Sequence, residues 1–212
     1  MYKKIKIKNT EDTIEHYWEE QFESAQNPMA WLTLGCRLKR AADIMFRISC
    51  KALKKENKSM VESIEKGTFG VGEHKLTARE IKVRLDCGLN KVYFLLLGFA
   101  FENIFKGILI SKNKNYIDIS KGIDKNLKTH NLVQISEKCG INLNQEERLS
   151  LERLTKEIQW QGRYPVPLKL NKMISSEFGI GATNAVDAYF PNHKVMGKLF
   201  QKLIKNNYIK NI

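Results

Sequence analysis

The segment VYFLLLGFAFENIFKGILI, residues 92–110, decides how the rest of the chain is interpreted. It is 19 residues long, which is enough for one membrane-spanning helix. However, Glu102, Asn103 and Lys106 lie inside it, and each charged side chain at the centre of a spanning helix costs about 3 kcal/mol. The segment therefore predicts the core helix of a folded domain and no membrane span.

The polar residues inside this helix need an explanation of their own. Three polar groups in an otherwise apolar helix must find partners or face an opening. Glu102 and Lys106 are four residues apart, so they share a face and can pair. Two interpretations remain open: an internal ion pair, or a ligand-binding site in a groove formed by Glu102, Asn103 and Lys106.

Capping signals outside the segment predict where the long helices begin. Asn27 followed by Pro28 is typical of a helix start, and this helix is expected to run to Gly67. Thr77 with Glu80 has the spacing of a capping box and opens the helix that contains residues 92–110. The first helix carries an apolar stripe at spacings of three and four, predicted to face a partner helix: Leu34, Leu38, Ala41, Met45, Ile48 and Ala52.

Shorter helices are predicted on both sides of this pair. Thr129 is expected to cap HNLVQISEKC, which ends at Gly140, and Asn144 with Glu147 caps the next helix. An amphipathic helix over about 11–26 and a basic amphipathic helix over about 191–209 add N- and C-terminal elements, while 112–128 and 168–185 are predicted loops. The sequence thus predicts an all-α antiparallel helical bundle, a single domain over residues 1–212 with its core at about 28–170.

The charge of the chain indicates a polyanionic partner. Lys and Arg number 36 against 23 Asp and Glu, giving a formal net charge of +13. Nucleic acid is the first partner class that such a charge favours. One flank of the first long helix concentrates the candidate nucleic-acid-binding residues, namely Arg40, Arg47, Lys51, Lys54 and Lys58.

The cysteines, the N-terminus and the histidines indicate the cellular compartment and whether a metal or cofactor is expected. The four cysteines are far apart with no C-x-x-C pair, which favours reduced thiols. The N-terminus MYKKIKIKNT lacks the apolar core of a signal peptide, so a cytoplasmic location is expected. The four histidines are scattered singly, so neither a metal site nor a cofactor is expected.

Two further positions are candidates for ligand contacts. His130 stands at a predicted helix start, where it either completes the first helical turn or acts as a neutral acceptor. In the segment GRYPVP, Gly162 can end a helix and the prolines stiffen the chain, which fixes the direction of Arg163. That arginine either caps helix carbonyls and stacks on Tyr164, or forms a preorganised phosphate or base contact.

These motifs, in this order, resemble the HEPN domain, an all-α family. The family shares an A-x-E-x-x-x-K-like helix, an H-[DN]-L helix start and an A/G-R-Y-P turn. The matching residues are Ala100, Glu102, Lys106, His130, Asn131, Leu132, Gly162, Arg163, Tyr164 and Pro165. The resemblance covers roughly residues 77–170.

The resemblance implies a homodimer and a role in a prokaryotic defence, stress or toxin–antitoxin system. It also implies a partner encoded in the same operon, such as a nucleotidyltransferase. Ribonucleases of the family carry an R-x(4–6)-H motif, which is absent here because positions 168–170 after Arg163 are Leu, Lys and Leu. The departure favours an RNA- or nucleotide-binding member in which Glu102, Asn103, Lys106, Asn131, Arg163 and Tyr164 contact the ligand.

Two alternatives to a binding protein stay open. In the first, the chain is a metal-independent endoribonuclease in which His130 is the general base and Arg163 stabilises the phosphate. In the second, it is a protein-interaction scaffold or antitoxin partner without nucleic-acid binding. Salt-dependent RNA affinity distinguishes a nucleic-acid binder from a scaffold.

Overall fold

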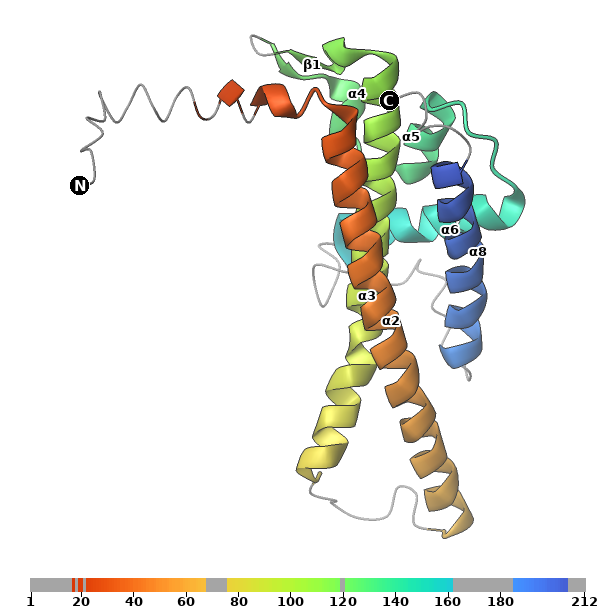
Figure 1. Ribbon diagram of the computed structural model, residues 1–212. Coiled ribbons are helices and arrows are strands. Elements are labelled where there is room, and N and C mark those ends of the chain that lie inside the picture. Colours follow the sequence, from red (N-terminus) through yellow and green to blue (C-terminus); the bar gives the residue numbers. More distant parts are fainter. Residues whose placement is uncertain are drawn as a thin grey trace, which may run out of the picture.

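The computed structural model describes residues 17, 19–20, 22–67, 76–118, 121–161 and 185–205. Two long antiparallel helices, α2 (Pro28–Glu65) and α3 (Ala78–Lys112), form a hairpin, and one end of it projects beyond the other elements (Figure 1). The helices beside the hairpin are α5 (Leu132–Lys138), α6 (Gln145–Lys156) and α8 (Ala185–Lys205). The predicted all-α class is confirmed at this level, since the only strands among the described residues form one two-stranded sheet.

The predicted capping residues account for the helix starts. The Asn27 side chain accepts a hydrogen bond from the Met29 amide at 2.9 Å, with Pro28 in the first turn of α2. Both bonds of the Thr77–Glu80 capping box are present at the start of α3. The equivalent pair at the start of α6, Asn144 and Glu147, is also complete. Each cap pairs amide groups that a helix N-terminus otherwise leaves without partners.

One predicted cap was assigned to the wrong residue. The N-cap of α5 is Asn131, whose side chain accepts from the Gln134 amide at 3.0 Å. Thr129 lies two residues earlier, and its hydroxyl accepts from the Asn131 amide. The helix ends were predicted correctly, because Gly67 and Gly140 follow α2 and α5 with φ of 65° and 70°, a conformation that favours glycine.

The predicted loop over 112–128 contains short regular elements. They are a 3-10 turn, an antiparallel pair of two-residue strands and a one-turn helix: η1 (Lys114–Tyr116), β1 (Ile117–Asp118), β2 (Gly122–Ile123) and α4 (Lys125–Lys128). Strands this short show no alternation that a sequence pattern could reveal.

The terminal helices were predicted approximately. Residues 22–24 are helical, within the predicted helix over 11–26. Helix α8 begins at Ala185, earlier than the predicted start near 191, and residues 206–209 lie outside the described part of the chain.

The face of α2 that packs on α3 differs from the predicted stripe. Leu34 and Ile48 are 46% and 37% exposed, and of the predicted stripe only Ala52 is fully buried. The buried residues of α2 are instead Pro28, Leu32, Gly35, Ala42, Ser49 and Ala52. The prediction was right for Leu38, Met45 and Ala52, which pack against the core or lie in it, but it missed the closest helix contact, which is made by small residues.

Gly35 shows why small residues are required at this contact. A Cβ atom built on Gly35 would lie 2.8 Å from Ile104 Cγ1 and 3.0 Å from the Ala100 carbonyl oxygen of α3. Gly107 of α3 meets α2 in the same way, with Trp31 Cβ at 3.1 Å. The two backbones therefore approach more closely than helices with larger residues at the contact could.

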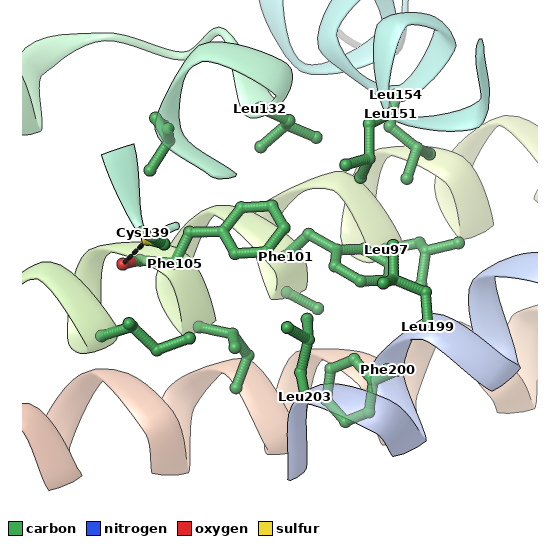
Figure 2. Close-up of a cluster of buried hydrophobic side chains, with 14 of the residues drawn as sticks. Leu97, Phe101, Phe105, Leu132, Cys139, Leu151, Leu154, Leu199, Phe200 and Leu203 are labelled. Carbon is green, nitrogen blue, oxygen red and sulfur yellow. Dashed lines mark hydrogen bonds between the residues drawn. The ribbon is translucent and has the colours of Figure 1, made fainter. Parts of the chain in front are cut away.

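The core surrounds the C-terminal half of α3. In Figure 2, Phe101 and Phe105 lie between side chains from α5, α6 and α8, and both are fully buried. The labelled neighbours from those helices are Leu132, Leu151, Leu154, Leu199, Phe200 and Leu203. Burial of an aromatic or leucine side chain contributes about 1.5–3 kcal/mol, so this layer is the main source of tertiary stability.

A histidine contributes to holding α8 against the hairpin. The His193 ring stacks on Phe46 of α2 with centroids 3.6 Å apart, and its Nδ1 is 2.9 Å from the Tyr93 hydroxyl of α3. Burial, with a further contribution from Lys39, lowers the pKa of His193, while Asp43 opposes the shift. The neutral imidazole is therefore the form that suits this contact.

Among the described residues, one helix, α3, is long and apolar enough to cross a membrane by length and composition. However, 72% of its most apolar window is buried inside the protein. This burial fits the predicted core helix, while the cellular compartment stays a prediction.

We expect Gly35→Ala to destabilise the protein by about 1–3 kcal/mol, because the added methyl group overpacks the α2–α3 contact. The matched control is Gly88→Ala, also inside a helix but with no atom within 4 Å of the added Cβ. That variant should gain about 0.5–1 kcal/mol from the better helix propensity of alanine. Urea denaturation of both variants measures the difference, and equal effects would contradict the close contact.

Candidate functional site

A buried ion pair lies at the centre of the candidate site. Lys106 Nζ donates to Glu102 Oε1 at 2.6 Å, and each side chain is only 8% exposed. Their four-residue spacing on α3 puts both on one face, as the sequence predicted. Removing two charges from water is costly unless the geometry is good and further hydrogen bonds are made, so the partners of the pair matter.

His130 supplies a third group to this pair. Its Nδ1 lies 3.0 and 3.1 Å from the two Glu102 carboxylate oxygens. The residue precedes the N-cap of α5, in the short link from α4, so tertiary packing and not sequence proximity brings it to α3. The helix motif with Glu102 and Lys106 and the helix-start motif with His130 therefore meet in one cluster.

The contact fixes how the imidazole can act. A carboxylate accepts hydrogen bonds, so Nδ1 carries the proton that it donates to Glu102. In a neutral ring Nε2 is then the acceptor. The His130 side chain is 44% exposed, whereas Glu102 and Lys106 are enclosed. The cluster therefore presents one accessible imidazole backed by a buried carboxylate and ammonium.

The two predicted asparagines have local structural contacts. The Asn103 amide group donates to the Phe99 carbonyl oxygen of its own helix at 2.7 Å. The Asn131 side chain caps α5 and accepts from the Gln134 amide. Both act on the backbone of the helices that carry the cluster, so a ligand contact of either one stays a prediction.

The third motif falls outside the described residues. The structure does not describe the residues of this motif, which are Gly162, Arg163, Tyr164 and Pro165. Their roles therefore stay predictions. The last described element before them is the π-helical segment η2 (Glu157–Gln161), which directly follows α6.

The basic residues predicted on the long helix form one exposed face. Arg40, Arg47, Lys51, Lys54 and Lys58 are all exposed on α2. Their spacings of three, four and seven residues keep them on one side, opposite the small residues that contact α3.

This face and the cluster lie on opposite sides of the hairpin. Ala100 and Ile104 contact α2. Glu102 is two residues from each of them, which is a rotation of about 200° around the axis of α3, so it faces away from α2. The basic face likewise points away from α3. The basic face therefore does not adjoin Lys106 and His130, and the two surfaces must be considered separately.

A further buried acid, which the sequence patterns did not reveal, lies on η2. Glu157 is 6% exposed, and burial raises the pKa of its carboxyl group, while Arg153 and Lys91 oppose the shift. Its four-residue spacing from Arg153 was the available signal. No group of three or more His, Cys, Asp or Glu that could hold a metal ion occurs in the described part of the chain.

Comparisons of the chain with protein-family models, with curated protein sequences and with solved structures find no match.

We expect Glu102→Gln to cost about 3–5 kcal/mol of stability, because it leaves the Lys106 ammonium buried without its counter-charge. The double variant Glu102→Gln/Lys106→Met should recover much of this loss. The matched control is Asp86→Asn, which breaks the exposed Lys82–Asp86 pair of the same helix and should cost less than about 1 kcal/mol. Urea denaturation distinguishes the cases, and equal losses for Glu102→Gln and Asp86→Asn would contradict a special role for the buried pair.

Proposed function

We propose that this chain is a HEPN-like RNA- or nucleotide-binding protein of a prokaryotic defence, stress or toxin–antitoxin system. The observation that carries the proposal is the exposed basic face of α2, with five cationic side chains on one side of a single helix. Cationic side chains bind phosphates and release counterions, which supplies most of the non-specific affinity for nucleic acid. The formal net charge of +13 acts in the same direction.

The cluster at Glu102 supports a second, separate contact surface on the other side of the hairpin. His130 has an accessible ring edge, and the enclosed Lys106 ammonium adds positive charge behind it. In the proposal, Arg163 and Tyr164 hold a phosphate, and His130 and Lys106 contribute to the same ligand. Glu102 then has the role of orienting the imidazole and balancing the lysine charge.

We expect binding to a mixed RNA pool that weakens steeply with salt. If the five residues of the basic face each neutralise one phosphate, the slope of log K against log salt is about −3.5 for single strands. Arg163→Ala should weaken RNA binding relative to the unchanged protein. The control variant Lys125→Gln/Lys128→Gln, in α4, should weaken it only by the effect of the lower net charge. Fluorescence anisotropy at several salt concentrations measures the salt slope and the RNA affinities of the two variants.

No binding at low salt, or affinity unchanged by Arg163→Ala, would contradict this proposal. Salt-insensitive capture of a single protein would favour the interaction scaffold instead. A protein encoded in the same operon, such as a nucleotidyltransferase, is the first partner to test in that case.

A second candidate function, metal-independent RNA cleavage, is favoured by the contact between Glu102 and His130. With Nδ1 held by the carboxylate, Nε2 can accept the proton of a ribose 2′-hydroxyl. The 2′-oxygen then attacks the phosphorus, the bond to the 5′-oxygen breaks, and that oxygen takes a proton from water and leaves as a 5′-hydroxyl. Arg163 would stabilise the charge on the phosphate, and the other product is a 2′,3′-cyclic phosphate.

If the protein cleaves RNA, His130→Ala should lower the rate by about 10²- to 10⁴-fold, the usual contribution of a general base. RNA affinity should change little, and added EDTA should have no effect. The control variant His16→Ala removes a histidine that belongs to none of the three motifs. Cleavage that survives His130→Ala would exclude this residue as the base.

We infer in addition that the protein forms a homodimer. The support is the exposed apolar side chains on both helices of the hairpin, of which Leu34 is 46% and Leu85 69% exposed. Exposed apolar side chains along a helix pair are available for contact with a second copy of the chain. Sedimentation velocity at tens of micromolar should give a dimer, and Leu34→Lys/Leu85→Lys should give a monomer, whereas a monomer for the unchanged chain would contradict the inference.

A further inference from the structure

The basic face of α2 forms a ridge along the helix. Arg40 and Lys58 are eighteen residues apart, which corresponds to about 27 Å along an α-helix. The ridge is rigid where it begins, because residues of α2 at Ala42, Ser49 and Ala52 are buried against the rest of the fold. Its far end follows the projecting part of the hairpin in Figure 1. The five cations are thus displayed in a fixed order along a line.

No aromatic ring accompanies these cations on α2. The two aromatic residues of the helix are used internally: the Trp31 indole donates to the Ala25 carbonyl oxygen, and Phe46 stacks on His193. The exposed apolar side chains between the cations are aliphatic, Ile44 at 43% and Ile48 at 37%. Proteins that bind unpaired nucleic acid stack its bases on aromatic rings, and this ridge offers none.

The ridge also offers little that could read base edges. Arg47 Nε donates to the Asp43 carbonyl oxygen of the same helix, and the only amide side chain of α2 is Asn57. Lysine ammonium groups act mainly as point charges toward phosphates. A ligand on this surface is therefore recognised through its backbone.

We infer that the ridge binds base-paired RNA through its phosphates, without preference for sequence. The inference builds on the proposed function and specifies its ligand class. In an RNA duplex the bases are stacked inside and need no aromatic partner, and both strands present phosphates at fixed positions. Recognition of duplex RNA by shape and backbone contacts is the general rule, because its deep major groove is closed to side chains.

The test compares three ligands with the full-length protein by fluorescence anisotropy. They are an RNA duplex of about 16 base pairs, the length that double-stranded RNA-binding domains span, one of its strands alone, and the DNA duplex of the same sequence. We expect the RNA duplex to bind at least about tenfold more tightly than the single strand, since both strands contribute phosphates. A second RNA duplex of scrambled sequence should bind equally well.

A matched pair of variants locates the contact. Lys51→Gln/Lys54→Gln removes two lysines of the ridge, three residues apart on α2, and should reduce the salt slope for the RNA duplex by about two. Lys125→Gln/Lys128→Gln removes two exposed lysines with the same spacing on α4 and should leave the slope unchanged. Circular dichroism confirms that both variants remain helical.

The outcomes separate this inference from the proposed function. Three results would overturn the inference and leave the RNA-binding proposal standing. They are equal or tighter binding of the single strand, tighter binding of the DNA duplex, and equal salt slopes for the two variants. Absence of binding to any RNA at low salt would overturn both.

Discussion

The close approach of α2 and α3 is the constraint on which the rest of the structure depends. Gly35 and Gly107 remove side chains where the two backbones meet, and Ala42 and Ser49 continue the narrow contact along α2. Helices with small residues at the contact can pack at short axial distances. This contact determines which residues of α3 face α2 and, by the helical period, which face α5 and α6.

The orientation of α3 in turn creates the cluster around Glu102. Because Ala100 and Ile104 point to α2, Glu102 and Lys106 point to the opposite side, where the link into α5 delivers His130. A buried ion pair is seldom retained for stability alone, since apolar residues of similar size are often as good. Glu102 Oε1 accepts from Lys106, and both carboxylate oxygens lie within hydrogen-bond distance of His130 Nδ1. This arrangement is better explained by a need to orient the imidazole than by a need to hold the helix.

Much of the helical framework could be predicted from sequence, because helix starts depend on residues that are close together in the chain. The caps at Asn27, Thr77 and Asn144 depend on residues within three positions, so spacing alone reveals them. The packing face of α2 could not be predicted in the same way, since small residues carry no hydrophobic signal. The pairing of Glu102 with Lys106 follows from helical spacing, but the contact with His130 spans 28 positions in the chain and depends on the tertiary fold.

The projecting end of the hairpin has an uneven local stability. The last buried residue of α2 is Ala52, and the first buried residue of α3 is Tyr93, so the turns beyond them lack a core of their own. Such turns open more readily than the body, and their amide hydrogens exchange with solvent at lower free-energy cost. Lys54 and Lys58 stand on these turns. A ligand that binds there spends part of its binding free energy on ordering the helix, so occupancy of this end and the rigidity of the hairpin are thermodynamically coupled.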